Sequence, residues 1–179
     1  MKSILSLILL FTCISSFSQA GSEIPIKEQF DYVALNWLGE SESLKSYAGI
    51  DKYCQSPEYR ASVNSLLDEI HGFDSLILSK LSDPTSYLNF NAKEERKTFS
   101  DIKSMESEYG TKNFVKKMRE SCAFRNEIEA NADDLKNGVG YESYDAKVML
   151  LETDMVRYLK KVDKLILKID DHLHVLDVN

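Results

Sequence analysis

A regular apolar stripe in the last third of the chain constrains its fold most strongly. From Tyr144 to Leu176, one position of every heptad is apolar, and the position three residues later is apolar except at His172. The next position is also apolar except at Glu152. The stripe contains Val148, Leu151, Met155, Tyr158, Leu159, Val162, Leu165, Ile166, Ile169, Leu173 and Leu176. Since a helix turns about 100° per residue, these residues form one broad face of a single long helix that packs against two neighbours in a bundle.

Two shorter helical patterns lie in the first half of the chain. Pro25 suits the first turn of a helix, and the apolar stripe that follows it ends near Gly39. Residues 40–55 are mixed in character and predict a connecting segment that includes a helical turn. Ser56-Pro57-Glu58 is typical of a helix start, and Asp83-Pro84 ends the second helix because proline cannot continue it.

A third pattern runs from Asn91 to Asn137-Gly138, and its apolar face changes phase at Gly110-Thr111. Either the helix breaks there, with Thr111 as a new cap, or one long helix turns a different face inward; we favour the break. No segment has the length and alternation of a convincing strand. The sequence therefore predicts an all-α, up-and-down bundle of about four long helices, formed as one domain by residues 21–179.

The first twenty residues match a secretory signal peptide rather than a part of the fold. Lys2 is followed by an apolar run, and Ser18 and Ala20 occupy the small-residue positions before a cut after Ala20. The apolar run is short for a membrane span. An uncleaved anchor is the alternative, and a lipoprotein anchored at Cys13 is disfavoured by its neighbours Phe11 and Thr12. The prediction is an exported protein of the periplasm or the extracellular space.

The charge balance narrows the classes of partner. The chain has 29 acidic and 22 basic residues, a formal charge of −7, which becomes −8 if residues 1–20, with Lys2 as their one charge, are removed. An acidic exported protein is a poor candidate for binding nucleic acid or anionic lipid. No other apolar run is long enough to cross a membrane.

Removal of the signal peptide leaves two cysteines, Cys54 and Cys122. In an oxidising compartment two remaining cysteines most simply form a disulfide, and the alternative is a pair of buried free thiols. Because there is no Cys-x-x-Cys spacing, a catalytic thiol role is disfavoured.

Candidate binding residues are few, and each has a structural alternative. Tyr87 and Phe90 lie in the segment that follows Pro84, where they either fold back on the core or form a partner contact. Arg125 lies close to the apolar stripe, where it either pairs with an acid such as Glu152 or anchors an anionic ligand.

The histidines are weak candidates for metal binding. Asp68 with His71, and Asp171 with His174, have the spacing of bundle metal ligands, but both pairs lie away from the apolar faces and are expected in solvent. His172 and His174 point in different directions on a helix, so they could share an ion only from an extended end.

These observations favour a non-enzymatic protein that acts through a protein partner, as an adaptor, an inhibitor or an assembly component. The alternative is a periplasmic binder of a small anionic ligand or a divalent metal, anchored by Arg125 or by His172 and His174. An enzyme is disfavoured because nucleophile-elbow, phosphate-loop and haem motifs are missing from the sequence. No cofactor is predicted.

Overall fold

The computed structural model describes residues 24–82 and 92–176, with no account of the side chains at positions 92–96 and 99. In these ranges the chain is helical and contains no strand, which confirms the predicted all-α class. The α-helices are α2 (Ile26–Ser43), α3 (Tyr47–Gln55), α4 (Pro57–Ser82), α5 (Ala92–Tyr109), α6 (Thr111–Ala130), α7 (Ala132–Lys136) and α8 (Tyr144–Asp171). Short 3-10 turns are η2 (Gly140–Glu142) and η3 (Leu173–Leu176). The predicted signal peptide, residues 1–20, lies outside the described ranges.

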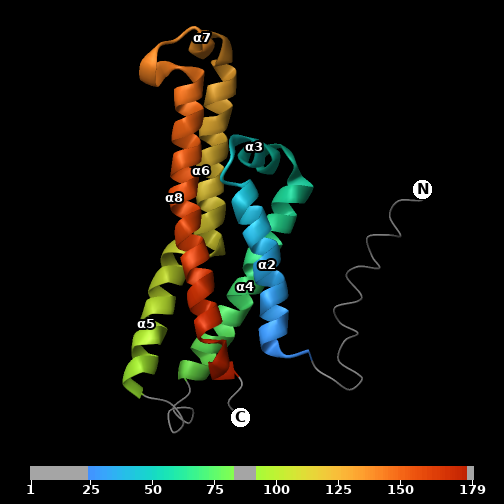
Figure 1. Ribbon diagram of the computed structural model, residues 1–179, viewed down its shortest axis with the longest axis vertical. Coiled ribbons are helices and arrows are strands. Elements are labelled where there is room, and N and C mark those ends of the chain that lie inside the picture. Colours follow the sequence, from blue (N-terminus) through green and yellow to red (C-terminus); the bar gives the residue numbers. More distant parts are fainter. Residues whose placement is uncertain (1–23, 83–91, 177–179) are drawn as a thin grey trace, which may run out of the picture.

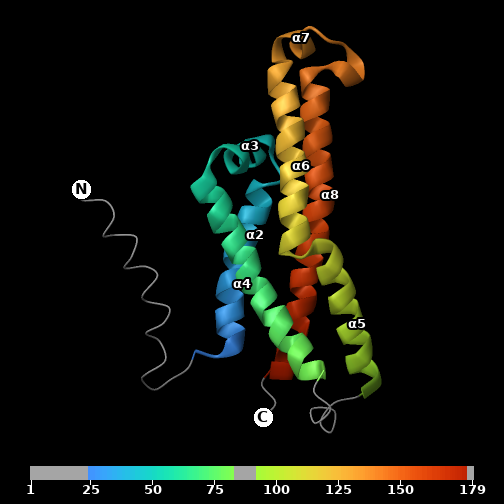
Figure 2. The same ribbon diagram turned by 180° about the vertical axis from the view of Figure 1, so that it is seen from behind.

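The helices run alternately up and down one long axis (Figure 1). α2 rises, α4 descends, α5 and α6 rise in succession, and α8 descends from the α7 end to the lower end. The view from behind shows the same arrangement, with α6 and α8 side by side in the upper half of the molecule (Figure 2). Among the helices of the described ranges, none combines the length and the hydropathy needed to cross a membrane.

α8 forms where the heptad pattern places it, and it supplies much of the core. The Ser143 hydroxyl accepts a hydrogen bond from the Ala146 N–H at 3.2 Å, so the helix begins with a side-chain cap. Its buried residues are Leu151, Met155, Leu159, Val162, Leu165, Ile166 and Ile169. The helix ends at Asp171, before the predicted end of the stripe, and η3 carries Leu173 and Val175 into the core. Burial therefore continues beyond the α-helix with a change of phase: Val175, which is not in the predicted stripe, is buried, whereas Leu176 of the stripe is half-buried.

α4 begins as predicted, because the Ser56 hydroxyl accepts a hydrogen bond from the Tyr59 N–H at 3.1 Å. The helix is described to Ser82, and the predicted stop at Asp83-Pro84 lies outside the described ranges. Its buried residues recur at helical spacing as Val63, Leu67, Ile70, Asp74, Ile77 and Leu81. The carboxylate at Asp74 is the exception in an otherwise apolar series.

The predicted break at Gly110 is confirmed, but its cap is different. α5 ends at Tyr109 and α6 begins at Thr111, so the N-cap is Gly110 and not Thr111. A Cβ at Gly110 would lie 2.6 Å from the backbone oxygen of Glu106, which explains why glycine occupies the junction. The break allows α5 and α6 to turn different apolar faces toward the core.

The first two helices extend further than the sequence predicts. α2 continues past Gly39 to Ser43, and residues 47–55 form the complete helix α3 rather than a single turn. A glycine inside a helix costs only about 1 kcal/mol. The burial of Ser41 and Leu44 beyond Gly39 offsets this cost and keeps the chain helical.

Aromatic side chains and a disulfide hold the helices together. Trp37 is fully buried and meets Phe114 edge-on, with ring centroids 5.5 Å apart, and Tyr53 meets the same phenylalanine at 6.1 Å. These contacts join α2, α3 and α6. The structure also contains the predicted disulfide between Cys54 and Cys122, whose Cα atoms are 5.5 Å apart. It ties the end of α3 to the middle of α6.

Candidate functional site

An apolar groove lies between α2 and α8. The inward face of α2 carries Phe30, Val33 and Trp37, but Leu35 and Leu38 lie outside this stripe. Leu167 lies outside the apolar stripe of α8 in the same way. Leu35 is 71% exposed and Leu167 is 63% exposed, which is unusual for large aliphatic side chains on two packed helices. Leu35, Leu38 and Leu167 are not among the residues that pack against the core cluster.

The groove has a volume of about 380 Å³ and an apolar floor and walls. Its apolar lining comes from Phe30, Ala34, Leu35, Leu38, Ile166 and Leu167. Three carboxylates, those of Asp31, Asp163 and Asp170, also border it. The surface thus combines an apolar cavity with a small number of fixed polar groups, which is typical of binding sites.

The carboxylates of the groove are held by neighbouring donors. Asp163 accepts a hydrogen bond from the Ser41 hydroxyl at 2.9 Å and one from the Trp37 indole N–H at 3.2 Å, and the Lys45 ammonium lies 3.6 Å away. The walls at this end are therefore fixed before any ligand arrives.

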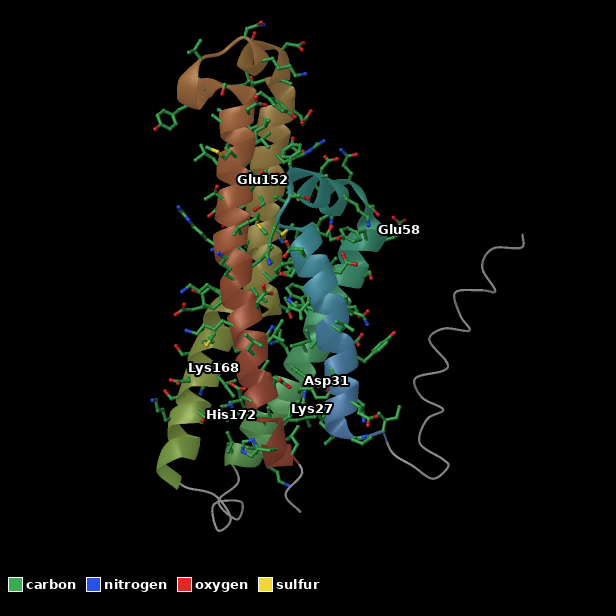
Figure 3. The ribbon with its side chains drawn as sticks, in the orientation of Figure 1. Lys27, Asp31, Glu58, Glu152, Lys168 and His172 are labelled. Atoms are coloured by element: carbon green, nitrogen blue, oxygen red, sulfur yellow. A yellow bond between two sulfur atoms is a disulfide. The ribbon has the colours of Figure 1, made fainter. Side chains whose placement is uncertain are left out.

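At the lower end of the groove, Lys27 bridges the two helices. Its ammonium lies 2.8 Å from the Asp170 carboxylate and also pairs with Asp31 on α2. Hydrogen bonds to Asp170 and then to Asp31 raise the pKa of Lys27 above its ordinary value. Figure 3 labels Lys27 and Asp31 on the lower half of α2, beside the lower end of α8. The charges that border the groove are therefore largely compensated within the protein.

A second cavity, of about 310 Å³, lies at the junction of α5 and α6. His71 lines it, together with Asp68, Glu106 and Thr111. The His71 side chain is only 11% exposed, so the expectation that it lies in solvent is wrong, whereas Asp68 is exposed as predicted. α4 contacts α2, α5, α6 and α8, so its buried sector is wide enough to cover a residue well away from the centre of the stripe.

His71 and Asp74 form a buried pair that lacks hydrogen bonds. The His71 Nδ1 lies 3.6 Å from the Asp74 carboxylate, and neither the ring nitrogens nor the carboxylate oxygens have a hydrogen-bond partner. Within the described ranges no group of three His, Cys, Asp or Glu side chains could hold a metal ion.

Arg125, predicted as an ion-pair residue or a ligand anchor, makes an ion pair. Its Nη2 lies 2.5 Å from the Asp51 carboxylate on α3, and its Nη1 donates to the Asn126 side chain at 3.1 Å. The partner is Asp51 and not Glu152, whose carboxylate accepts the Tyr47 backbone N–H at 2.7 Å. Arg125 therefore joins α6 to α3 alongside the disulfide.

The C-terminal histidines are engaged by the fold. Thr98 Oγ1 lies 2.9 Å from His172 Nε2, and the Lys168 carbonyl lies 2.8 Å from His172 Nδ1, so both ring nitrogens of His172 have polar neighbours. His174 Nδ1 lies 3.1 Å from the Asp171 carbonyl, and the two rings are 5.9 Å apart. Figure 3 labels Lys168 and His172 near the lower end of α8. The candidate contact residues Tyr87 and Phe90 lie outside the described ranges.

Comparison of the chain with known protein families, curated proteins and solved structures finds no match. The groove residues are functional candidates that sequence reasoning missed. The available signal was the occurrence of leucines off the apolar stripes, at Leu35, Leu38 and Leu167.

Proposed function

We propose that this chain is an exported, non-enzymatic helical protein that acts by binding a protein partner, as an adaptor, an inhibitor or an assembly component. The predicted signal peptide supports export, and the Cys54–Cys122 disulfide is consistent with an oxidising compartment. In this proposal a single bundle domain begins after the signal is cleaved.

The observation that carries the proposal is the groove between α2 and α8. It exposes Leu35, Leu38 and Leu167 around a cavity whose carboxylates are already compensated by Lys27 and Lys45. A partner therefore gains most by burying apolar surface there, at roughly 25 cal/mol per Å². The occupant that fits is the apolar face of a partner helix, because a helix presents side chains at the spacing that a groove between two helices can receive.

The alternative, a binder of a small anion or a divalent metal, has less support. Its proposed anchors are used within the fold, since Arg125 pairs with Asp51 and both ring nitrogens of His172 have polar neighbours. An unpaired guanidinium or a free imidazole in a cavity would have favoured this function.

The proposal is tested by a double variant, Leu35→Ser with Leu167→Ser. Leu76→Ser is the matched control, because Leu76 is an exposed leucine on α4 and not a lining residue of the groove. Each protein is recovered from its own host's envelope or medium, and a co-purifying protein is identified by mass spectrometry, purified and titrated against all variants. We expect the double variant to lose about tenfold or more in affinity, because buried apolar anchors dominate such interfaces. Equal affinity for the wild type and the double variant would refute the groove as the binding surface.

A further inference from the structure

The upper end of the α6–α8 hairpin is a second surface with unexplained features. We call residues 126–150 the hairpin tip; they include the end of α6, α7, η2 and the first two turns of α8. Both ribbon views show α6 and α8 continuing above α3, with α7 at the extremity (Figures 1 and 2). The hairpin tip therefore projects away from the bundle formed by α2, α4 and α8.

The hairpin tip displays large apolar side chains to solvent. Val139 is 90% exposed and Tyr141 is 84% exposed, and they flank Gly140, whose φ of +72° lies in the left-handed region that favours glycine. Met149 and Leu150 are exposed nearby in sequence, in the second turn of α8. These four side chains make no contribution to the core cluster.

The hairpin tip is also strongly acidic. It contains six carboxylates and two lysines, a formal charge of −4 in a chain whose total is −7. Both lysines are engaged: Lys147 lies 3.2 Å from the Glu127 carboxylate, and the Lys136 ammonium lies 5.5 Å from the centre of the Tyr144 ring. In the part of the chain that the structure describes, the acids without an ion pair include Asp133, Asp134 and Asp145.

The base of the hairpin tip is held in place before binding. Glu129 accepts hydrogen bonds from the Tyr47 and Tyr144 hydroxyls, the latter at 2.9 Å, which lowers the pKa of Glu129 below its ordinary value. Leu135 is buried and anchors α7 to the hairpin. A partner would therefore meet a formed surface, and binding would require little further ordering of this region.

From these features we infer that the hairpin tip docks a protein surface that presents cationic side chains around apolar ones. The cations would pair with the uncompensated aspartates, while apolar groups would cover Val139 and Tyr141. The two surfaces differ in chemistry, since the carboxylates of the α2–α8 groove already have cationic partners. The inference rests on the proposed role in protein binding but on a separate surface, so that one molecule could join two partners.

The test uses the complete protein and a synthetic probe, a helical peptide of about 18 residues with leucine on one face and lysine on the other. A peptide with glutamate in place of lysine is the control for charge. Binding is measured by fluorescence anisotropy, and its location by ¹⁵N–¹H chemical shifts. The tip variant is Val139→Ser with Tyr141→Ser, and the matched control is Leu76→Ser, an exposed leucine outside both surfaces. The groove variant, Leu35→Ser with Leu167→Ser, reports any binding of the leucine face to the groove. All these positions are exposed, so the fold is expected to survive, which thermal unfolding checks.

We expect saturable binding of the leucine–lysine peptide, with shifts at residues 126–150 that are lost when glutamate replaces lysine. Affinity at the tip, read from these shifts, should be about tenfold weaker in the tip variant, as is common for central interface anchors, and unchanged in Leu76→Ser. Raising the salt from about 50 mM to about 300 mM should weaken binding severalfold through screening.

Three results would overturn the inference. The first is equal affinity in the tip variant. The second is equal binding of the glutamate peptide, and the third is concentration-dependent shifts at the tip without peptide, which would assign the surface to a second copy of the chain. Loss of binding only in the groove variant would refute the hairpin tip while leaving the proposed function intact.

Discussion

The ring of His71 lies 3.6 Å from the carboxylate of Asp74, one turn along α4, and Asp74 is only 1% exposed. Neither side chain has a hydrogen-bond partner in the structure. A buried carboxylate without hydrogen bonds is costly, and buried ion pairs often stabilise less than apolar residues of the same shape.

Replacing both members of the pair, in Asp74→Leu with His71→Leu, is therefore expected to stabilise the protein by about 1 to 2 kcal/mol, whereas removing Asp74 alone would leave His71 buried without its partner. Leucine has the same branched arrangement of heavy atoms as aspartate, and the neighbouring buried residues on this face of α4 are apolar. The measurement is urea unfolding followed by circular dichroism. Asp68→Leu, at an exposed position on the same helix, is the control and should change stability by less than about 0.5 kcal/mol. A loss of stability in the double variant would show that the pair makes a net favourable interaction.

Tyr59 makes the stability depend on pH in the alkaline range. Burial and the hydrogen bond that its hydroxyl donates to Glu40 raise the pKa of Tyr59 from 10.0 to about 12. The folded state therefore holds this proton more tightly than the unfolded state does. The contribution of this proton to the free energy of unfolding is complete below pH 10 and is lost as the pH rises toward 12.

We expect Tyr59→Phe to be less stable than the wild type at neutral pH and to lose less stability than the wild type above pH 10. Urea unfolding at a series of pH values measures this slope. Tyr32→Phe, at an exposed position on α2, is the control and should leave the slope unchanged. Parallel curves for the wild type and Tyr59→Phe would contradict the assignment.

Removing the disulfide is expected to lower the free energy of unfolding substantially. The bridge joins residues separated by 68 positions, and loop-closure entropy gives roughly 4 kcal/mol for such a loop. The variant is Cys54→Ala with Cys122→Ala, compared with the wild type treated with dithiothreitol. Both should unfold at a similar, lower urea concentration. A change below about 1 kcal/mol would show that the bridge constrains the unfolded chain little.

Loss of the cap at the start of α8 is expected to lower the free energy of unfolding by about 1 kcal/mol. The variant is Ser143→Ala, which removes the hydroxyl that accepts the Ala146 N–H. Ser62→Ala, at an exposed position inside α4, is the matched control and should be neutral or slightly stabilising, since alanine favours helices. Thermal unfolding of the two variants separates capping from helix propensity, and equal melting temperatures would contradict the assigned role of Ser143.

Local chemistry made several features of the fold predictable. The Ser56 hydroxyl and the glycine at position 110 explain two helix boundaries. The heptad stripe predicts the buried face of α8 because periodicity reports directly which side chains leave water. The predicted end of α2 near Gly39 was wrong, because the burial of Ser41 and Leu44 outweighs the helix-breaking tendency of this glycine.

The candidate surfaces depend on relations that a single sequence does not contain. Leu35 and Leu167 are 132 positions apart in the chain and border one cavity only because α2 and α8 pack together. Likewise, His71 was wrongly predicted to lie in solvent, because its position was judged by its angle from a single apolar stripe. Several helices cover α4, so its buried sector is wider than that stripe. The apolar residues off the stripes were visible in the sequence, but their common location was not.

The position of the disulfide has a mechanical consequence. A force applied to the two ends of the chain is carried across the Cys54–Cys122 bond, so the 68 positions between them cannot be drawn out. At about 3.4 Å per residue, this shortens the fully stretched chain by roughly 230 Å. α4 and α5 lie within the protected loop, whereas α2 and α8 lie outside it. Under tension the outer helices of the oxidised protein would extend while the loop between the two cysteines stays covalently closed. Only the reduced protein would extend to its full length.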